Sequence, residues 1–442
     1  MRREQSHFAP RRILLRDWRK NWDSPRRFFD RHYRSGWMVI ALALLTLPAT
    51  ADDWTQWRGP NRSDISYEKG TLKDWPEGGP KQLWLFKDAG VGYSGFSVVG
   101  DTLYTMGSRD EFECLIALNV GDGTEKWSMS IGPRLENNWG DGPRDTPTVD
   151  GDYVYCMTAP GELACCRTED GSIVWQAALT TDFGGQVPNW GYCESVLVDE
   201  GKVICTPGGE QGTMLALDKL TGEKIWQSKG ITDNAHYSSA IVVVHDGRRQ
   251  YIQLLMDKLI GVDAGTGEVI WSTPWVGKTA VIPTPIYHDG YVYISSGYNA
   301  GCKLVKIEGD KAVDVYENKT MKNHHGGVIL VGDYLYGYSD NVGWLCQNFK
   351  TGENVWSDKE KLGKGCLTCV DGMLYLMSEI EGEVVLIEAS PEGWHEHGRF
   401  VLEPKTTLRK PAGHIWTHPV VANGRLYLRD QELVFCFDVK AK

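Results

Sequence analysis

The segment Ala216–Trp226 reads ALDKLTGEKIW, and the chain repeats its pattern four more times. Each copy begins with a small residue, which is followed by an apolar residue in all but the last copy, and each has a glycine four positions before a tryptophan. A motif that recurs at a fixed period indicates a repeat architecture in which every copy is one supersecondary unit. The other copies are ALNVGDGTEKW at Ala117–Trp127, ACCRTEDGSIVW at Ala164–Trp175, GVDAGTGEVIW at Gly261–Trp271 and CQNFKTGENVW at Cys346–Trp356.

The spacing of the motif tryptophans gives the number of units. Neighbouring tryptophans are 45 to 51 residues apart, except for a gap of 85 residues between Trp271 and Trp356, which holds a degenerate copy. Tyr316 in AVDVYENK and Phe400 in HEHGRFVL extend the series with the tryptophan replaced. Trp84 in KQLWLF lies 43 residues before Trp127, the tryptophan of the first complete copy. The series therefore contains eight units.

A second series of segments alternates apolar residues around a turn rich in Asp, Asn and Gly. This pattern predicts β-hairpins, because these residues tolerate the positive φ of a tight turn. One hairpin and one motif in about 40–50 residues is the period of a four-stranded propeller blade. The sequence therefore predicts an all-β protein with an eight-bladed β-propeller. The eight hairpins are SVVGDTLYTM, PTVDGDYVYC, VLVDEGKVIC, IVVVHDGRRQYI, PIYHDGYVYI, VILVGDYLYG, LTCVDGMLYL and PVVANGRLYL.

The two ends of the series predict how the ring closes. The chain ends in ELVFCFDVK, a third strand with no fourth strand after it, whereas the Trp84 strand has no hairpin before it. Pairing these two strands completes the last blade and removes the exposed strand edges that promote aggregation. We therefore expect the Trp84 strand to complete the blade of residues 425–439.

The N-terminal region has the composition of an export signal. Residues 1–36 contain eleven Arg and Lys against four Asp and Glu, and the apolar run WMVIALALLTLPATA follows, with Ala49-Thr50-Ala51 at its end. A basic region, a short apolar region and small residues at positions −3 and −1 predict cleavage before Asp52. We expect an exported protein, periplasmic or extracellular, with N-terminal membrane anchoring if the signal is not cleaved. The expected parts are a basic extension at 1–36, the signal at 37–51, an N-terminal segment at 52–80 and the propeller at 81–442.

The net charge narrows the class of partner. The whole chain carries −11, and removing residues 1–51, which carry +7, leaves −18. This sign is unfavourable for binding nucleic acid or an anionic lipid surface. We expect a monomer that binds a protein partner or a small molecule.

The eleven cysteines all lie within the predicted propeller. The adjacent pair Cys165-Cys166 is too closely spaced for an undistorted disulfide, and neighbouring residues of a strand point to opposite faces. Cys366 and Cys369 form a single CxxC pair, which is not a zinc site without a second pair. Cys165, Cys346 and Cys436 occupy the alanine position of the repeated motif, and we expect them to be small buried apolar residues.

The repeat pattern, clearest at Ala216–Trp226, resembles the tryptophan-docking repeat of pyrroloquinoline quinone (PQQ) propellers. That family includes the quinoprotein dehydrogenases and non-enzymatic members such as the outer-membrane assembly lipoprotein. The opening WTQWRGPNRSD and the stretches NWGY, AHYSS and NHHGG are similar to exported PQQ-like repeat proteins of unassigned activity. The resemblance implies a propeller in which each tryptophan packs onto the next blade, and it leaves the function open.

The irregular connections between blades predict where a ligand would bind. Each connection feeds an innermost strand, so the connections converge on the mouth of the central channel, and loops on a rigid scaffold often carry function. Clustered aromatic and polar residues are typical of a ligand pocket, although they could also simply fill the channel. The candidate ligand-binding residues are Trp139, Arg144, Trp190, Tyr192, Glu194, His236, Tyr237, His325, His414 and Trp416.

Three classes of function fit this pattern. The favoured class is a binding or scaffold propeller with no catalytic residue, cofactor or metal. The second class is a PQQ-dependent alcohol or polyol dehydrogenase, and the third is a carbohydrate-binding propeller. The dehydrogenases of the family are longer, and the sequence contains no ordered set like their calcium-and-base loop.

The dehydrogenase alternative makes specific demands on the residues. PQQ carries three carboxylates, which need cations, and its ring needs an aromatic side chain for stacking. Calcium needs several oxygen ligands, and turnover needs a carboxylate base. The candidates are Arg144 and Lys258 as cations, Trp190 or Trp416 for stacking, Glu194, Asn189 and Asp145 as calcium ligands, and Glu194 as the base.

Overall fold

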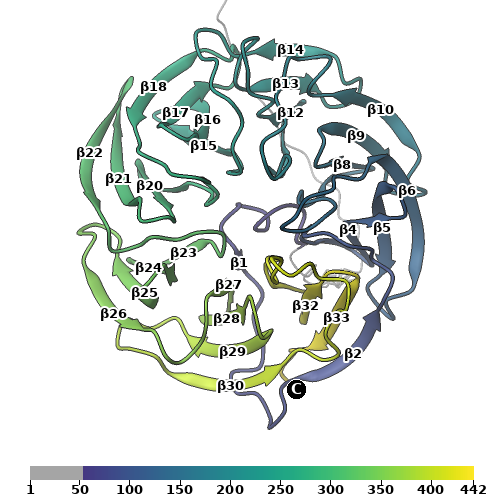
Figure 1. Cartoon of the computed structure of the whole chain (residues 1–442). Helices are drawn as coiled ribbons and strands as arrows, with labels where there is room; N and C mark the ends of the chain where they lie inside the picture. The colour runs from purple at the N-terminus through teal and green to yellow at the C-terminus, as the bar shows by residue number, and fades with distance from the viewer. Residues whose placement is uncertain (1–52) are drawn as a thin grey trace, which may run out of the picture. The chain divides into compact units, whose positions relative to one another are not determined.

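The computed structural model describes residues 53–442, which form eight antiparallel sheets arranged around a central axis (Figure 1). Each sheet is one blade of a β-propeller, and the number of blades confirms the prediction from the repeats. The basic extension and the export signal predicted at 1–51 lie outside the described residues. Within the described part, no helix is long and apolar enough to cross a membrane.

The first four blades each consist of four consecutive strands, ordered from the channel to the rim. Blade 1 contains β3 (Ser97–Val99), β4 (Thr102–Arg109), β5 (Phe112–Asn119) and β6 (Glu125–Pro133). Blade 2 contains β7 (Thr148–Asp150), β8 (Tyr153–Met157), β9 (Glu162–Arg167) and β10 (Ile173–Ala178). Blade 3 contains β11 (Leu197–Asp199), β12 (Lys202–Cys205), β13 (Leu215–Asp218) and β14 (Lys224–Gln227). Blade 4 contains β15 (Ile241–His245), β16 (Arg248–Leu254), β17 (Lys258–Asp263) and β18 (Val269–Pro274).

The remaining blades follow the same order, with one added strand in blade 7 and one borrowed strand in blade 8. Blade 5 contains β19 (Ile286–His288), β20 (Tyr291–Ser296), β21 (Gly301–Glu308) and β22 (Lys311–Asn318). Blade 6 contains β23 (Val328–Val331), β24 (Tyr334–Ser339), β25 (Gly343–Asn348) and β26 (Asn354–Asp358). Blade 7 contains β27 (Gly365–Val370), β28 (Met373–Ser378), β29 (Glu383–Glu388) and β30 (Glu396–Val401), and β1 (Ile65–Ser66) pairs parallel with β27. Blade 8 contains β31 (Val420–Ala422), β32 (Arg425–Asp430), β33 (Leu433–Asp438) and the early strand β2 (Lys81–Phe86).

The ring closes where β2 completes blade 8, as expected from the unpaired ends of the series. Strand β2 runs antiparallel to β33, with Trp84 opposite Cys436. Figure 1 shows the purple β2 beside the yellow β33, so the two ends of the repeat series share one sheet. The pairing leaves neither strand as a free partner for another chain.

The repeated glycine and tryptophan dock one blade on the next. The indole of Trp226 is 8% exposed, and its Nε1 donates to the carbonyl of Ala264 in blade 4 at 3.3 Å. Gly267 lies beneath this indole with φ +76°, and a Cβ there would stand 2.5 Å from the ring. Trp175 covers Gly222 of the following blade in the same way. The motif glycine is therefore required both for its positive φ and for the space that the preceding tryptophan fills.

The two degenerate units keep this geometry with other aromatic side chains. Tyr316 lies opposite Leu304 in blade 5, and its hydroxyl donates to the carbonyl of Phe349 at 3.0 Å. Phe400 lies opposite Val384 in blade 7. Both residues occupy the position that tryptophan holds in the complete copies.

The adjacent cysteines of blade 2 pack between blades. Cys165 belongs to the core between blades 2 and 3, whereas Cys166 belongs to the core between blades 1 and 2. The two thiols therefore point to opposite faces of β9. All eleven cysteines lie in the described residues, and each is unbridged there.

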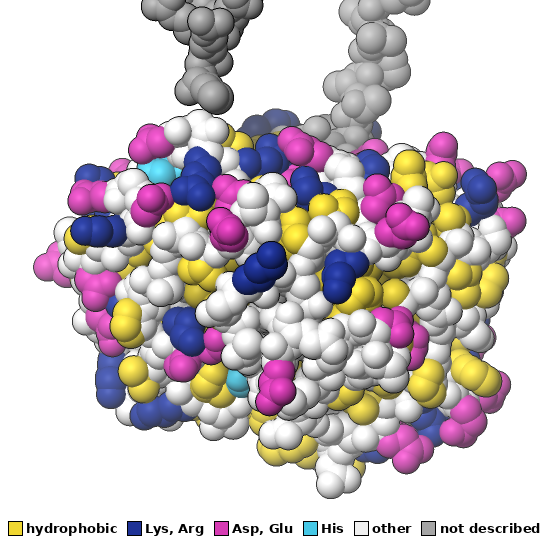
Figure 2. All heavy atoms as spheres, turned by 90° about the horizontal axis from the view of Figure 1, so that it is seen from above, with side chains coloured by type: hydrophobic (Ala, Val, Ile, Leu, Met, Phe, Trp, Pro, Cys, Tyr) yellow, Lys and Arg dark blue, Asp and Glu magenta, His cyan; other side chains and the backbone are white. Residues whose placement is uncertain are grey.

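The side of the propeller carries mixed charge. Figure 2 shows acidic and basic side chains interspersed, with small groups of apolar side chains between them. Opposite charges placed side by side keep the long-range field of this surface modest despite the negative total.

The segment Trp54–Glu68 crosses the centre of the ring, where Figure 1 shows it in purple with β1. It contacts the innermost strand of every blade, or the residues next to that strand. These contacts make the N-terminal segment a hub that joins all eight blades. The partners, in blade order, are Val98, Val149, Val196, Ala240, Thr284, Val328, Cys369 and Asn423.

Arg62 lies at the middle of this hub, with its side chain 4% exposed. Its Nη1 donates to the carbonyl of Ala240 at 2.7 Å, and its Nη2 donates to the carbonyls of Ser195 and Val196 at 3.0 and 2.5 Å. Burial lowers the pKa of Arg62 to about 10, so the guanidinium stays charged at neutral pH. One side chain therefore joins blades 3 and 4 to the hub.

The hub has an unusual backbone. Arg58, Arg62 and Asp64 have φ values of 60°, 53° and 57°, a left-handed region that costs non-glycine residues on the order of 1–3 kcal/mol each. Buried contacts compensate for this cost. The Nε of Arg58 lies 2.7 Å from Oδ2 of Asp64, and each side chain is 1% exposed. Tertiary contacts rather than local preference therefore fix this segment.

Candidate functional site

A cavity of about 190 Å³ opens on the face that carries the blade-to-blade connections. Trp57 of the hub forms part of its wall, and the rest comes from two chemically different halves. Blades 1 to 4 supply aromatic residues and one cation, namely Tyr93, Trp139, Arg144, Trp190 and Tyr237. Blades 5 to 8 supply imidazoles among aromatics, namely Tyr298, His324, His325, Trp416 and His418.

Six of the ten residues predicted from the sequence line this one cavity. They are Trp139, Arg144, Trp190, Tyr237, His325 and Trp416. The other four, Tyr192, Glu194, His236 and His414, do not line it, and each has a different environment.

Alternation along the chain explains three of these four residues. Cys193 lines the cavity, whereas its neighbours Tyr192 and Glu194 point away from it. The hydroxyl of Tyr192 donates to the carbonyl of Pro207 at 2.9 Å inside the core. His236 likewise stands behind Tyr237, edge-on to its ring. In extended chain, successive side chains point to opposite sides, and the composition of a segment does not show which of them faces the cavity.

Glu194 lies beneath the cavity rather than in it. Its carboxylate accepts the backbone N–H of Thr206 at 2.7 Å and a side-chain N–H of Gln253 at 3.2 Å, and its side chain is 2% exposed. Burial raises the pKa of Glu194 to about 7. This carboxyl therefore holds neighbouring blades together and is not available as a base for a ligand in the cavity.

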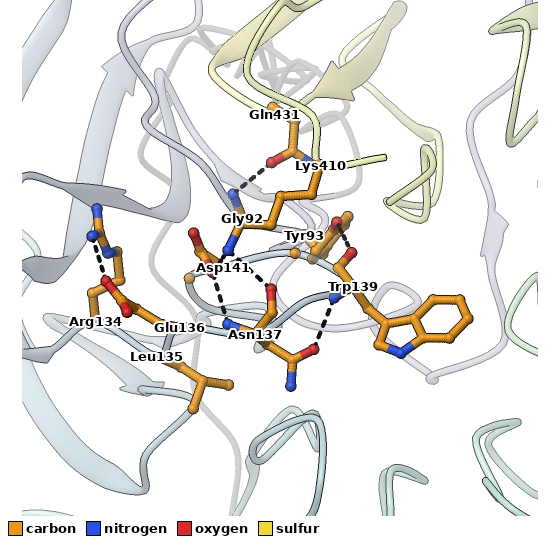
Figure 3. A network of polar contacts seen from close by, with 12 residues as sticks. Gly92, Tyr93, Arg134, Leu135, Glu136, Asn137, Trp139, Asp141, Lys410 and Gln431 are labelled. Carbon is orange, nitrogen blue, oxygen red and sulfur yellow. Dashed lines mark hydrogen bonds and ion pairs between the residues drawn. The ribbon is translucent and has the colours of Figure 1, made fainter. Parts of the chain in front are cut away.

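A network of polar contacts fixes the rim of the cavity beside Trp139 (Figure 3). Lys410 Nζ lies 2.6 Å from Oδ1 of Asp141, which also accepts the backbone N–H of Asn137 at 2.8 Å. The hydroxyl of Tyr93 donates to the carbonyl of Trp139 at 2.9 Å. In Figure 3 the indole of Trp139 points away from this network, and the residue is 47% exposed. A large aromatic surface is therefore held open at the mouth by a rigid loop.

Glu379, in the turn between β28 and β29, orients the imidazole half. Its Oε2 lies 2.9 Å from Nε2 of His325 and accepts the N–H of Trp416 at 3.1 Å, while its Oε1 lies 3.6 Å from Nδ1 of His414. Burial acts to raise the pKa of Glu379, but contact with His325 and the charges of Lys364 and His414 outweigh it and lower the pKa to about 2. One ionised carboxylate therefore positions three rings at the edge of the cavity.

The neighbouring His324 is positioned by a second ion pair. Lys364 Nζ lies 2.9 Å from Nδ1 of His324 and 2.8 Å from Oδ1 of Asp340. Burial, with His325 and Lys364 nearby, lowers the pKa of His324 to about 2, and burial also lowers the pKa of His325. Both imidazoles are therefore neutral at pH 7. The ammonium contact leaves the proton of His324 on Nε2. Nε2 of His325 lies beside the carboxylate of Glu379 without a hydrogen bond between them. The negative charge of that carboxylate favours the tautomer of His325 that carries its proton on Nε2 and leaves Nδ1 as an acceptor.

His418 connects the cavity to the hub. Its ring lies 4.6 Å from the indole of Trp57, measured between centroids, and its Nδ1 lies 3.2 Å from Oδ2 of Asp64. Its Nε2 lies 2.9 Å from the carbonyl oxygen of His325. The cavity wall and the hub are thus one continuous structure.

Sequence reasoning missed several lining residues for identifiable reasons. His324 adjoins the predicted His325, and His418 lies two residues after the predicted Trp416. Trp57 was noted only as part of a motif. Tyr298 lies in the turn between β20 and β21. Its backbone there is left-handed, with a φ of +53°, and a sequence does not reveal φ.

The residues present do not fit calcium. Of the expected ligands, Glu194 and Asp145 are buried and accept backbone N–H groups, whereas Asn189 is exposed. The three oxygens therefore do not face one space. Across residues 53–442, no three His, Cys, Asp or Glu side chains are arranged to hold a metal ion.

The expected cations do not converge on a quinone either. Lys258 does not line the cavity, and its Nζ lies 2.7 Å from Oδ1 of Asp233. Arg144 does line the cavity, so it is the one member of that pair able to meet an anion there. A tricarboxylate such as PQQ would lack the second cation that the sequence analysis assigned to it.

The fold and its docking motif define a PQQ-like repeat β-propeller with a cavity at the channel mouth. A family model described as outer membrane protein assembly factor BamB matches residues 111–358. This is more than half of the chain, and the protein belongs to that family.

One relative agrees with this assignment over part of its length. Outer membrane protein assembly factor BamB of Vibrio cholerae serotype O1 is 30% identical over 139 residues, which are 31% of this chain and 33% of that protein. The match therefore spans about a third of the relative's length.

Two solved structures share the fold. BamB from Moraxella catarrhalis superposes with a TM-score of 0.59 at 17% identity, over 82% of this chain and 98% of that chain. A europium-containing methanol dehydrogenase superposes with a TM-score of 0.58 at 13% identity, over 85% of this chain and 89% of that chain. At these identities the likeness extends to the fold alone.

Proposed function

We propose that this protein is an exported binding module that takes a small molecule or a segment of a partner in the cavity at its channel mouth. The observation that carries the proposal is the rigidly held, half-exposed Trp139 above a cavity lined by aromatic and imidazole side chains. The polar network holds the backbone of Trp139, and an indole that stays 47% exposed contributes little to folding. It is the kind of anchor that dominates the energy of binding sites.

Membership of the BamB family supports binding rather than turnover. The relatives are described as outer membrane protein assembly factors, and we extend from them only the idea of a protein that works by holding another molecule. Export is part of the proposal because residues 37–51 have the pattern of a signal sequence.

Four probes test this function on the purified protein. They are cellotetraose, trigalacturonate, an unstructured peptide rich in apolar residues, and PQQ with calcium. We expect at least one probe to bind saturably, followed by tryptophan emission, and Trp139→Ala to weaken that binding about tenfold or more.

A matched control separates the cavity from the surface around it. Val276 is 68% exposed and does not line the cavity, so Val276→Ala should leave binding unchanged. Equal loss in both variants, or no binding of any probe, would contradict the proposal. Dye reduction that depends on PQQ would favour the dehydrogenase alternative instead.

A further inference from the structure

Arg144 is a cation of the cavity wall with no acidic partner. Its guanidinium lies 5.5 Å from the centre of the Tyr93 ring, and its Nη2 donates to the carbonyl of Gly140 at 2.6 Å. Its Nη1 contacts the carbonyl of Gly142 in the same loop. Among the described residues, no carboxylate oxygen lies within 4.0 Å of it. The guanidinium therefore has a fixed position and free N–H groups, which suit an incoming carboxylate.

The side chains that line the cavity include no carboxylate. Glu379 and Asp340 do not line the cavity. Glu379 contacts His325, and Asp340 forms an ion pair with Lys364. An aromatic cavity of this kind could attract a cationic ligand, but Arg144 in its wall opposes one. Arg144 is the one Lys or Arg among the lining residues, so the lining favours an anion even though the whole chain is acidic.

The imidazole half offers a fixed donor beside a fixed acceptor. His324 presents Nε2–H and His325 presents an unprotonated Nδ1, because Lys364 and Glu379 hold the opposite nitrogen of each ring. The two rings are adjacent, with centroids 5.0 Å apart. A hydroxyl group both donates and accepts a hydrogen bond, and neighbouring hydroxyls would match this pair. A purely apolar ligand would leave both imidazoles without partners.

Trp416 lies between these two polar regions. Its ring centroid is 5.7 Å from that of His325 and 4.9 Å from that of Tyr93, over which Arg144 is stacked. Its N–H is held by Glu379, which fixes the plane of the indole. A ring that lies against Trp416 can therefore reach the imidazoles on one side and the guanidinium on the other.

We propose that the cavity binds an acidic saccharide, a uronic acid unit whose ring lies on Trp416, whose carboxylate meets Arg144 and whose hydroxyls meet His324 and His325. This assignment rests on the proposed function and names its ligand class. Trp139 at the mouth adds a second stacking surface, so the ligand is an oligosaccharide rather than a single sugar. The chemistry is binding alone and needs no co-reactant.

Calorimetric titration of the full protein tests the charge and the ring together. The probes are oligomers of galacturonate, glucuronate and mannuronate, each compared with its methyl ester, which keeps the ring and removes the charge. We expect at least one acid to bind about tenfold more tightly than its ester, because the Arg–carboxylate bond is lost in the ester. Arg144→Met should abolish this preference, so that this variant binds acid and ester with equal affinity.

Two further variants show whether the preference depends on Arg144 itself and whether binding depends on the orientation of the imidazoles. Arg134 stands at the outer end of the same rim network, paired with Glu136 at 3.0 Å and outside the cavity, so Arg134→Met should retain the preference (Figure 3). Glu379→Gln should weaken acid and ester alike, since the neutral amide no longer holds His325 in one tautomer. Circular dichroism and the melting temperature of each variant establish that it is folded.

Each other outcome overturns the inference. Esters that bind as tightly as acids, an Arg144→Met variant that keeps the preference, or no binding of any uronate would each exclude an acidic saccharide. If the uronates fail while the apolar peptide or cellotetraose still depends on Trp139, the ligand class is wrong and the binding module stands. If no probe depends on Trp139, both proposals fail.

Discussion

Arg62→Met is expected to lower the free energy of unfolding by about 3–5 kcal/mol at pH 8, the usual cost of breaking a buried charged network. The substitution removes the donors for three buried carbonyls in blades 3 and 4. It also removes the positive charge near Glu194 and Asp145, both of which are buried. The methionine keeps most of the volume, so the loss reports polar contacts rather than a cavity.

The loss should depend on pH in a defined direction. Burial raises the pKa of Glu194 to about 7 from an ordinary value near 4.5, so this group favours the folded protein below pH 4.5 and loses that contribution as pH rises through 7. Without Arg62 the pKa of Glu194 rises further, and the decline continues to higher pH. The difference between wild type and variant is therefore expected to widen from pH 5 to pH 8.

Denaturant unfolding at the two pH values measures this difference. Arg134→Met, which breaks a partly exposed ion pair, is the control and should change the free energy of unfolding by about 1 kcal/mol or less. A loss in Arg62→Met that is equally small would show that the hub does not hold the blades together. A loss that is identical at pH 5 and pH 8 would show that Arg62 does not lower the pKa of Glu194.

Trp226→Ala is expected to cost about 3–5 kcal/mol, the range for removing a large buried aromatic side chain. The indole fills the space above Gly267 and donates to the carbonyl of Ala264, and both contacts belong to the next blade. Neighbouring blades stabilise one another, so losing one docking contact weakens the closed ring. The measurement is denaturant unfolding at neutral pH.

Trp139→Ala provides the contrasting result for the same change. Trp139 is 47% exposed, against 8% for Trp226, so its loss should change stability by about 1 kcal/mol or less and affect binding instead. A Trp226→Ala protein that unfolds like wild type, or a Trp139→Ala protein that is severely destabilised, would reverse the roles given to the two tryptophans.

The blade count and the closure were predictable because their signals are local. Asp-Gly turns, the motif glycine and the motif tryptophan each determine a few residues of backbone or one docking contact, and they recur in order along the chain. The pairing of Trp84 with the last blade followed from counting strands. Physical requirements within one repeat therefore determined the architecture of the whole.

The hub was not predictable in this way. Arg62 bonds to Ala240 across 178 residues of chain, and its left-handed φ is imposed by those partners. The segment has neither helical nor strand periodicity, so nothing local in it indicates that it crosses the channel. A local sequence pattern carries no signal of long-range contacts of this kind.

The cavity falls between these two cases. The connections that line it were identified because they are irregular, aromatic and rich in histidine. The sequence does not show which of two adjacent residues faces the cavity. Cys193 lines it, whereas the neighbouring Tyr192 points away. The partners that define the imidazoles, Glu379 and Lys364, lie in other blades and carry no signal of their own.

Hydroxyl-radical footprinting of the full protein tests the central claim, that ligands are taken in the cavity at the channel mouth. Trp139 at this mouth is 47% exposed. A second cavity, of about 410 Å³, lies between the hub and the innermost strands, and Tyr67 beside it is 51% exposed. The protein is labelled alone and with each of the four probes at saturation. We predict that a bound probe lowers the oxidation of Trp139 and leaves that of Tyr67 unchanged; protection of Tyr67 with Trp139 still fully oxidised would contradict the account.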